Sequence, residues 1–341
     1  MKASKIVSVA VAALVIAGCA AFVLWPSEDR GWYAWDPTVG EIDYSKISAN
    51  PRIIETIEQM YTIAYGADVP APKAGARLPF DPIAGKTADG IWIKSSGTGP
   101  GVPDTTLYFT DSMTSNMKII SYSLGFTDSY VQMLGDGVWD TVAAAGNSTW
   151  NAYPKNGMAW NATLAAEMTL STVNLISFLE SRAGDGNTYC LVVWGYMLNY
   201  AAVDAALAGY PNVKLLCVDY YKAIGSLEYL LSVVDALGWL VGKSSDQNKA
   251  AIDLQERIGA IDDALSSSKG KSVYMELPAG TSPGSNTLTQ LCFDLLRLDN
   301  INKTSGTNMF ADANVVLAGP EVIFFDAKDS RTMDQKMRVL S

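Results

Sequence analysis

Residues 189–218, YCLVVWGYMLNYAAVDAALAGYPNVKLLCV, contain the pattern on which the fold prediction depends. An apolar run at 189–194 is followed by a loop, an alanine-rich helical segment at 201–208 and a second apolar run at 213–218. Strands that are apolar on both faces are typical of parallel sheets, because helices cover each side of such a sheet. The stretch therefore predicts a strand, a crossover helix and a neighbouring parallel strand.

The same alternation extends in both directions along the chain. Further apolar strands are predicted at 118–123, 141–144, 272–277 and 321–325. Helices with an apolar stripe are predicted at 127–134, 162–182, 224–268 and 288–298. The helical stretch at 224–268 is interrupted by Gly242-Lys243-Ser244-Ser245 and separates the earlier strands from the later ones. The predicted fold class is α/β, with two lobes of parallel-sheet α/β sandwich joined by a long interlobe helix.

The predicted domains are a signal or anchor at 1–25, an accessory N-terminal region at 26–115, a first α/β lobe at 116–222, the interlobe helix at 223–269 and a second α/β lobe at 270–341. The accessory region is rich in Pro, Gly, Asp, Ser and Thr. It contains one helical pattern at 51–65 and two short strand patterns, at 90–94 and 105–110, around a glycine- and proline-rich turn. Nothing in this region indicates a function.

The first 25 residues are predicted to export the chain and to anchor it to the cell membrane. Lys2 and Lys5 precede an uncharged apolar run at 6–25, and a charged segment follows it. This charge order places the bulk of the chain on the extracytoplasmic side. Ile16-Ala17-Gly18-Cys19 has the form of a lipobox, in which Cys19 carries the lipid. The alternative is an uncleaved helix, since about 20 apolar residues span a bilayer core.

The composition excludes several classes of chemistry. The 341 residues include 25 basic and 35 acidic side chains, a net charge of −10 and no histidine. Without histidine there is no Ser-His-Asp or Cys-His nucleophile system, no His-ligated zinc and no imidazole switch. The acidic balance argues against nucleic-acid binding, because affinity for phosphates depends on clustered Lys and Arg.

The remaining cysteines are predicted to be buried free thiols. Cys190, Cys217 and Cys292 lie in apolar segments without CxxC spacing, so a metal site is not indicated. In an exported chain, a Cys190–Cys217 disulfide between neighbouring strands is the alternative. Three sequons begin at Asn147, Asn161 and Asn302 and matter only in a host that glycosylates exported proteins.

Motifs of enzymes are weak in this chain. SxxK patterns at 115–118 and 266–269 lack the companion motifs of the enzymes that use them. The glycine-rich segment at 96–101 lacks the GK[ST] ending of a phosphate-binding loop and is typical of an ordinary turn. The chain is therefore predicted not to be an enzyme, and an α/β enzyme with an unrecognised site is the least favoured alternative.

Short motifs in a fixed order carry a family resemblance. They are KIISY at 118–122, LGDGVWDTV at 134–142, YPKNG at 153–157, LGWLVG at 237–242, GSN at 284–286, LDNIN at 298–302 and LAGPEVIFFD at 317–326. In these motifs and their order, the chain from Lys118 to its C-terminus resembles ABC transporter substrate-binding proteins of the cobalamin, haem and ferric-siderophore (iron-complex) type.

The resemblance implies partners as well as a fold. Proteins of this type deliver their ligand to ABC permease and ATPase subunits, and each lobe tends to carry a glutamate that engages the permease. Glu167 is the first-lobe candidate, and Asp312 is the second-lobe candidate because Ala313 stands at the family's glutamate position. The family continues beyond the strand at 321–325, so the second lobe is expected to be incomplete or completed differently.

The ligand of such a protein lies outside the carboxyl ends of the parallel strands. The loops expected there contribute Tyr122, Ser123, Trp150, Tyr153, Trp194, Tyr196, Tyr220, Tyr221, Pro278 and Thr281. Aromatic rings offer large apolar contact with a polar tip, which suits a bulky, flat, partly polar ligand such as a metal chelate or macrocycle. The alternative is that each ring only caps the edge of the sheet. No cofactor and no metal-ligand set of the chain's own are predicted.

The sequence thus predicts a membrane-anchored extracytoplasmic solute-binding protein that captures an iron complex, haem or corrinoid-type ligand for ABC import. The alternative is a non-transport surface binding or structural module on the same fold. The long interlobe helix predicts little domain closure.

Overall fold

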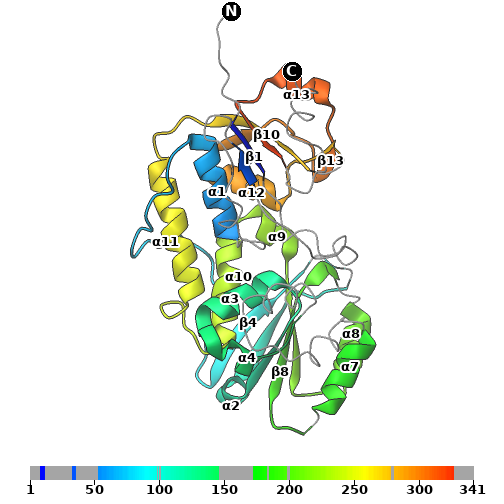
Figure 1. Cartoon of the computed structure of the whole chain (residues 1–341). Helices are drawn as coiled ribbons and strands as arrows, with labels where there is room; N and C mark the ends of the chain where they lie inside the picture. The colour runs from blue at the N-terminus through cyan, green and yellow to red at the C-terminus, as the bar shows by residue number, and fades with distance from the viewer. Residues whose placement is uncertain are drawn as a thin grey trace, which may run out of the picture. The chain divides into compact units, whose positions relative to one another are not determined.

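Two α/β units make up the chain in a computed structural model, and each unit contains its own parallel strands (Figure 1). The structure describes residues 8–11, 33–35, 53–97, 99, 101–145, 172–182, 184–197, 200–277 and 280–325. Unit 1 comprises residues 1–74 and 256–341, and unit 2 comprises residues 75–255. The division falls within helix α11 (Lys249–Ala264). The predicted α/β fold class with parallel sheets is confirmed.

The main sheet of unit 2 is parallel throughout. Its strands, in spatial order, are β7 (Val142–Ala145), β6 (Met117–Ser121), β8 (Thr188–Trp194) and β9 (Val213–Val218). Every side chain of β8 is buried, as expected of a central strand with helices on both faces. Figure 1 shows α3 (Leu124–Leu134) and α10 (Leu227–Leu240) on one side of this sheet, and α7 (Thr172–Ser181) and α8 (Tyr200–Leu207) on the other. The parallel arrangement brings the carboxyl ends of β6, β8 and β9 to one edge.

A smaller antiparallel sheet completes unit 2. It consists of β3 (Ala84–Lys86), β4 (Gly90–Ser95) and β5 (Thr105–Thr110), followed by the short helix α2 (Asp111–Ser115). Ile91, Ile93 and Phe109 are buried on its inner face. The last residue of β4 contacts β9. The hydroxyl of Ser95 accepts the N–H of Cys217 at 2.9 Å.

The sheet of unit 1 is mixed. Its strands, in order, are β12 (Leu298–Asn300), β10 (Lys271–Glu276), β14 (Val322–Phe325), β1 (Ser8–Val11) and β2 (Tyr33–Trp35), and only β2 is antiparallel to its neighbour. A separate ribbon pairs β11 (Thr281–Pro283) with β13 (Thr307–Met309). Helices α1 (Ile53–Tyr65) and α12 (Leu288–Leu295) and the second half of α11 belong to the same unit, as does α13 (Asp312–Ala318).

Polar contacts join α1 to the rest of unit 1. The Arg257 guanidinium donates two hydrogen bonds to the Glu58 carboxylate, from Nε at 2.6 Å and from Nη2. The Tyr65 hydroxyl donates to the Leu296 carbonyl at 2.6 Å. The two units thus divide the predicted accessory region, since α1 belongs to unit 1 and the β3–β5 sheet belongs to unit 2.

Part of the predicted anchor segment lies within the described residues. Ser8–Val11 form β1, which pairs with β14, whereas Cys19 lies outside the described residues. The strand at Ser8–Val11 differs from the uncleaved helix that is one form of the predicted anchor, and the other form depends on Cys19, so the anchor stays a prediction. Within the described ranges, no helix is both long enough and apolar enough to cross a membrane.

The helical stretch predicted at 224–268 has one break that was expected and one that was not. α10 ends at Leu240 and α11 begins at Lys249, on either side of the predicted break at 242–245. A further break separates α9 (Tyr220–Gly225) from α10, because Ser226 leaves the helical conformation and its hydroxyl caps α10 by accepting the Tyr229 N–H at 3.2 Å. The helix predicted at 288–298 stops at Leu295, since Arg297 adopts a φ of 52° and the next residues pair with β10 as β12.

Candidate functional site

The strand ends of unit 2 carry an aromatic cluster, which consists of Phe126, Trp194, Tyr196, Tyr220 and Tyr221. Trp194 is the last residue of β8, and Tyr196 follows it in a 3₁₀ turn. Tyr220 and Tyr221 begin α9 just after β9. Four of the predicted ligand residues therefore lie together, because β8 and β9 are adjacent parallel strands that end at the same edge.

The rings of the aromatic cluster meet in tilted and edge-to-face arrangements. The ring centres of Tyr196 and Tyr220 lie 4.9 Å apart, and those of Tyr196 and Tyr221 lie 5.9 Å apart. Trp194 contacts Phe126 at 4.5 Å and Tyr220 at 5.4 Å, the latter edge to face. These separations and tilts are the favourable ones for aromatic pairs.

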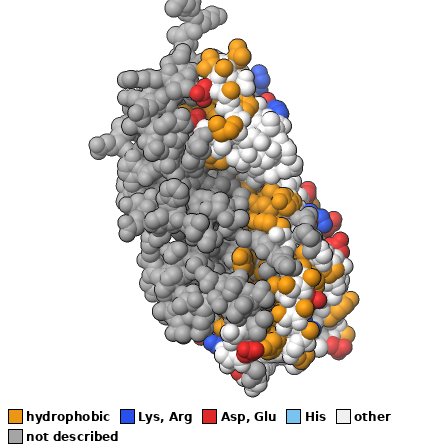
Figure 2. All heavy atoms as spheres, turned by 90° about the vertical axis from the view of Figure 1, so that its right-hand side faces the viewer, with side chains coloured by type: hydrophobic (Ala, Val, Ile, Leu, Met, Phe, Trp, Pro, Cys, Tyr) orange, Lys and Arg blue, Asp and Glu red, His pale blue; other side chains and the backbone are white. Residues whose placement is uncertain are grey.

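Burial changes across the aromatic cluster. Phe126, Trp194 and Tyr220 are buried, Tyr196 is half-buried and Tyr221 is 52% exposed. On the face of the molecule that Figure 2 views, hydrophobic side chains reach the surface among scattered charges. The indole Nε1 of Trp194 is buried and has no hydrogen-bond partner among the described residues. The cluster therefore has a buried floor and an exposed aromatic tip.

Charged groups lie beside the exposed tip. The buried Asp219 caps α9, since its Oδ1 accepts the Lys222 N–H at 3.1 Å. The Lys222 ammonium lies 3.6 Å from Oδ2 of the same carboxylate and 5.9 Å from the centre of the Tyr229 ring. The ammonium of the exposed Lys222 is thus paired with the Asp219 carboxylate, directly after Tyr221 in the chain.

Two further predicted ligand residues, Tyr122 and Ser123, follow the end of β6. Tyr122 is half-buried and its N–H donates to the Val192 carbonyl at 3.0 Å. Ser123 is buried, and its carbonyl accepts the hydroxyls of Ser121 at 3.2 Å and Thr127 at 3.3 Å. Ser123 therefore occupies the interior where α3 begins.

A loop that the sequence analysis interpreted as an ordinary turn also reaches this edge. We call it the glycine loop and define it by the described residues of 96–102, which are Ser96, Gly97, Gly99, Gly101 and Val102. The N–H of Ser96 donates to the Cys217 carbonyl at 3.0 Å. A Cβ built on Gly97 would lie 2.9 Å from Cα of Gly195, the residue between Trp194 and Tyr196. The glycines at every second position of this loop were visible in the sequence. The sequence of the loop does not, however, indicate which distant backbone segment the loop contacts.

The remaining predicted site residues lie elsewhere. Thr281 begins β11 in unit 1 and is half-buried, and its carbonyl accepts the Leu277 N–H at 2.7 Å. Asp312 is the first residue of α13 in unit 1 and is half-buried. Those outside the described residues are Cys19, Trp150, Tyr153, Glu167 and Pro278.

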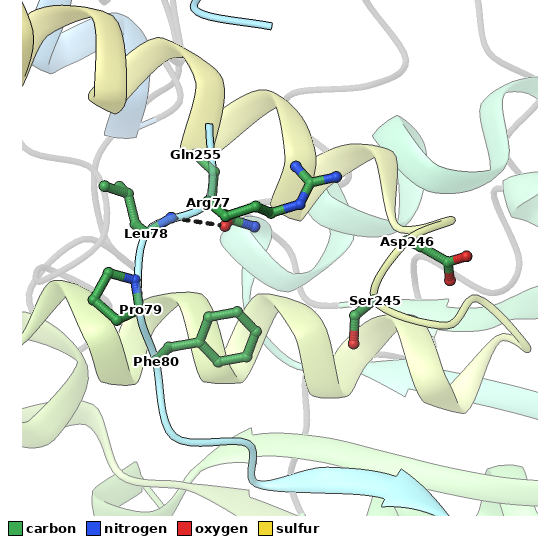
Figure 3. A pocket seen from close by; sticks show the side chains of 7 residues that line it. All are labelled: Arg77, Leu78, Pro79, Phe80, Ser245, Asp246 and Gln255. Atoms are coloured by element: carbon green, nitrogen blue, oxygen red, sulfur yellow. Dashed lines mark hydrogen bonds between the residues drawn. The ribbon is translucent and has the colours of Figure 1, made fainter. Parts of the chain in front are cut away.

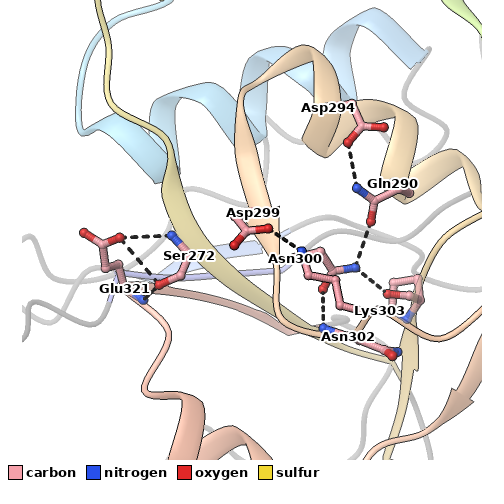
Figure 4. A network of polar contacts seen from close by, with 9 residues as sticks. Ser272, Gln290, Asp294, Asp299, Asn300, Asn302, Lys303 and Glu321 are labelled. Atoms are coloured by element: carbon pink, nitrogen blue, oxygen red, sulfur yellow. Dashed lines mark hydrogen bonds and ion pairs between the residues drawn. The ribbon is translucent and has the colours of Figure 1, made fainter.

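Unit 1 has a buried asparagine network between β11 and β12 (Figure 4). Asn300 Nδ2 donates to the Pro283 carbonyl at 2.8 Å and to Gln290 Oε1 at 3.1 Å. Asn302 Nδ2 donates to the Ser282 carbonyl at 2.9 Å, while Oδ1 accepts the Thr304 hydroxyl at 2.6 Å. Because Asn302 is fully buried, the folded chain does not present its sequon for glycosylation.

An open pocket of 420 Å³ in unit 2 lies on other elements (Figure 3). Its lining residues are Arg77, Leu78, Pro79, Phe80, Ser245, Asp246 and Gln255. The Leu78 N–H donates to Gln255 Oε1 at 3.1 Å, which ties the segment before β3 to α11. Arg77 and Asp246 bring opposite charges, and no lining residue follows a parallel strand. The pocket is therefore separate from the aromatic cluster.

The prediction of buried free thiols is confirmed for Cys190, Cys217 and Cys292. In the β8–β9 register Cys190 faces Lys214 and Cys217 faces Val193, so the two thiols are not opposite each other. Burial raises the pKa of Cys217 to about 11 and that of Cys292 to about 12. No group of three Cys, Asp or Glu side chains in the described part of the chain is placed to hold a metal ion.

Solved structures resemble this fold, although no protein-family model and no curated protein matches the chain. A periplasmic binding protein from Veillonella parvula matches with a TM-score of 0.50 and 16% identity, over 72% of this chain and 81% of that one. A periplasmic heme binding protein from Pseudomonas aeruginosa matches with a TM-score of 0.46 and 16% identity, over 66% and 76%. The periplasmic vitamin B12 binding protein of Vibrio cholerae matches with a TM-score of 0.44 and 17% identity, over 66% and 83%. The predicted fold resemblance to substrate-binding proteins is thus confirmed, and at these identities the likeness concerns the fold alone.

Proposed function

We propose that this chain is an extracytoplasmic solute-binding protein that captures a bulky, flat, partly polar ligand for an ABC importer. The observation that carries the proposal is the aromatic cluster at the carboxyl edge of the parallel sheet, in the fold of a periplasmic binding protein. Open α/β sheets bind ligands at this edge. The same cluster supports a binding role over an enzymatic one, since the residues that converge there are rings and not a nucleophile with a base.

The chemistry of the aromatic cluster favours an iron complex, haem or corrinoid-type ligand. Tyr196 and Tyr221 offer ring faces with hydroxyl tips, which suit a flat, partly polar chelate. The chain has no histidine, and a tyrosine or carboxylate oxygen remains available as a protein ligand to the metal. Shape and ring stacking therefore dominate recognition.

A surface of unit 1 supports docking to the permease. Asp312 begins α13, and Val316 and the 85% exposed Leu317 lie on the same helix. Met309 at the end of β13 is exposed as well. We expect Leu317→Asp to abolish the stimulation of ATP hydrolysis in the permease–ATPase complex and to leave ligand affinity unchanged. An equal loss of both would contradict this docking surface.

A membrane anchor at residues 1–25 belongs to the same proposal. Lipidation of Cys19 and an uncleaved apolar helix both hold the chain at the extracytoplasmic face. Metabolic labelling with a radioactive fatty acid separates them, because only a Cys19 lipoprotein incorporates the label and loses it in Cys19→Ser.

A non-transport binding module on the same fold is the second candidate. It is favoured by Ala313, which replaces the glutamate that the family resemblance places at the second-lobe docking position. Ligand binding without any effect on a permease–ATPase complex would support it.

Titration of the intrinsic fluorescence tests the proposed function. The probes are haemin, cyanocobalamin, a ferric tris-catecholate and a ferric tris-hydroxamate. We expect saturable quenching by at least one of them, because the cluster contains Trp194 and three tyrosines. The absence of quenching with all four would overturn the assignment of the ligand class.

A further inference from the structure

We infer that the glycine loop is a brace that holds the two halves of the aromatic cluster at a fixed separation and so determines which flat ligands fit. One half is Trp194 with Tyr196 at the end of β8, and the other is Tyr220 with Tyr221 at the start of α9. This inference rests on the proposed function of the cluster. It assigns a positioning role to a loop of unit 2 that lies in the predicted accessory region.

The first attachment of the brace is backbone against backbone. A Cβ built on Gly195 would lie 2.8 Å from Cα of Gly97, and one built on Gly99 would lie 2.3 Å from the carbonyl oxygen of Gly195. Contacts of Cβ atoms below 3.0 Å essentially do not occur in proteins. Gly97, Gly99 and Gly195 therefore allow an approach that any side chain would prevent. The glycine loop therefore contacts the backbone of Gly195, the residue between Trp194 and Tyr196.

The second attachment is to β9. The Ser95 hydroxyl accepts the Cys217 N–H at 2.9 Å, and the Ser96 N–H donates to the Cys217 carbonyl at 3.0 Å. Cys217 thus has both backbone polar groups bound where β4 ends and the glycine loop begins. This contact lies two residues before Asp219, which caps α9.

The third attachment reaches α9 through a tyrosine of α10. The Tyr229 hydroxyl lies 3.4 Å from the Ser96 hydroxyl and accepts the Asp219 N–H at 3.3 Å. Asp219 in turn caps the helix that carries Tyr220 and Tyr221. The glycine loop therefore contacts the backbone of one half of the cluster directly and is linked to the helix cap of the other half through Tyr229.

The consequence concerns the 4.9 Å spacing of Tyr196 and Tyr220. A flat ligand that rests on both rings needs them in a fixed relative position. A change in the distance between the two ring centres should therefore alter the affinity for a flat ligand and for a thick ligand by different factors. Ser96, Gly97 and Gly99 are only half-buried, and the loop is therefore the part that gives way when a Cβ is added. All of these residues belong to unit 2.

Two variants loosen the brace in different ways, and one serves as a matched control. Gly97→Ala adds a Cβ against Gly195, and Tyr229→Phe removes only the hydroxyl that links Ser96 to Asp219. Gly209→Ala is the control, since a Cβ there meets nothing within 4 Å. If Gly97→Ala fails to fold, Tyr229→Phe carries the test.

The affinities for haemin, which is flat, and for cyanocobalamin, which is thick, are measured for each variant. We expect the ratio of the two Kd values to change by about tenfold in Gly97→Ala and Tyr229→Phe and to stay constant in Gly209→Ala. Where only one probe binds, its Kd alone is compared. Equal Kd values in the wild type and both brace variants would overturn the inference.

A second readout needs no ligand. In chains labelled with fluorotyrosine, the ¹⁹F resonances of Tyr196 and Tyr220, assigned with Tyr→Phe variants, should shift in both brace variants and not in Gly209→Ala. Unchanged resonances would overturn the brace even where a probe binds. If the resonances shift and the wild type binds no probe, the proposed function fails while the positioning of the rings stands.

Discussion

Tyr196 and Tyr220 pack in a tilted arrangement with their ring centres 4.9 Å apart, although they follow different strands of the unit 2 sheet. The contact exists because β8 and β9 are parallel neighbours that end at one edge. Below the pair, Trp194 and Phe126 are buried, and beside it Tyr221 reaches solvent. The buried rings should contribute more to the stability of the fold than the exposed ring of Tyr221, which is accessible to a ligand.

Trp194 and Tyr221 should therefore separate folding from binding. Trp194→Ala removes a buried ring that contacts Phe126 and Tyr220, and we expect it to lower the free energy of unfolding by about 3–5 kcal/mol. Tyr221→Ala removes an exposed ring and should change the free energy of unfolding by no more than about 0.5 kcal/mol. Denaturant unfolding of both variants measures the difference. Similar losses in the two would contradict the division into floor and tip.

The Glu58–Arg257 pair should stabilise unit 1 measurably. Its side chains are only 19% and 14% exposed and form two parallel hydrogen bonds, so Glu58→Gln removes the negative charge that these two hydrogen bonds bring to a largely buried guanidinium. We expect Glu58→Gln to lower the free energy of unfolding by about 2 kcal/mol, a value between those for exposed and for fully buried ion pairs. Lys73→Ala is the control, because the Lys73–Asp263 pair is more than half exposed and should contribute less than about 1 kcal/mol. Equal effects of the two substitutions in chemical denaturation would refute this ranking.

Asp235 should make the chain less stable as the pH rises. Burial in α10 raises the pKa of its carboxyl, against the hydrogen bonds from Ser245 and from the Trp239 indole at 3.2 Å. The folded state then holds the proton more tightly than the unfolded state. The free energy of unfolding should fall as the pH rises from the unfolded pKa of about 4 through the raised folded value. Asp235→Asn, which can still accept the indole N–H, should remove this part of the decline, and a pH profile parallel to the wild type would show the prediction to be wrong.

The three described cysteines should be unreactive in the folded chain. Each is buried, and burial raises the pKa of Cys217 to about 11 and moves that of Cys190 higher still. Thiolate is the reactive form, so a disulfide reagent at about pH 8 should modify none of them in a Cys19→Ser background until denaturant is added. Rapid modification of one thiol before unfolding would contradict this burial.

The elements that depend on local pattern were predictable. Strands β5 and β9 begin and end where their apolar or β-branched runs do, at 105–110 and 213–218. The breaks that were missed depend on single capping groups or on distant pairing. Ser226 ends one helix and starts the next with its own hydroxyl, and β12 forms only because β10 lies beside it.

The candidate site was predictable in part for the same reason. The order of parallel strands follows from β–α–β connections, so Trp194, Tyr196, Tyr220 and Tyr221 could be assigned to one edge. The glycine loop could not, because its contact with Gly195 joins residues almost a hundred positions apart and has no local signature. Nor does the pattern of the accessory region indicate that α1 and the β3–β5 sheet belong to different units.

Equilibrium binding to cluster variants tests the central claim most directly. The probes of the fluorescence titration are dialysed against the wild type, the double variant Tyr196→Ala/Tyr221→Ala, and Tyr108→Ala, which removes a 66% exposed tyrosine of β5 outside the cluster. The account predicts one binding site in the wild type and in Tyr108→Ala, and an affinity about tenfold or more weaker in the double variant. A double variant that binds as tightly as the wild type, or a wild type that binds none of the probes, would contradict it.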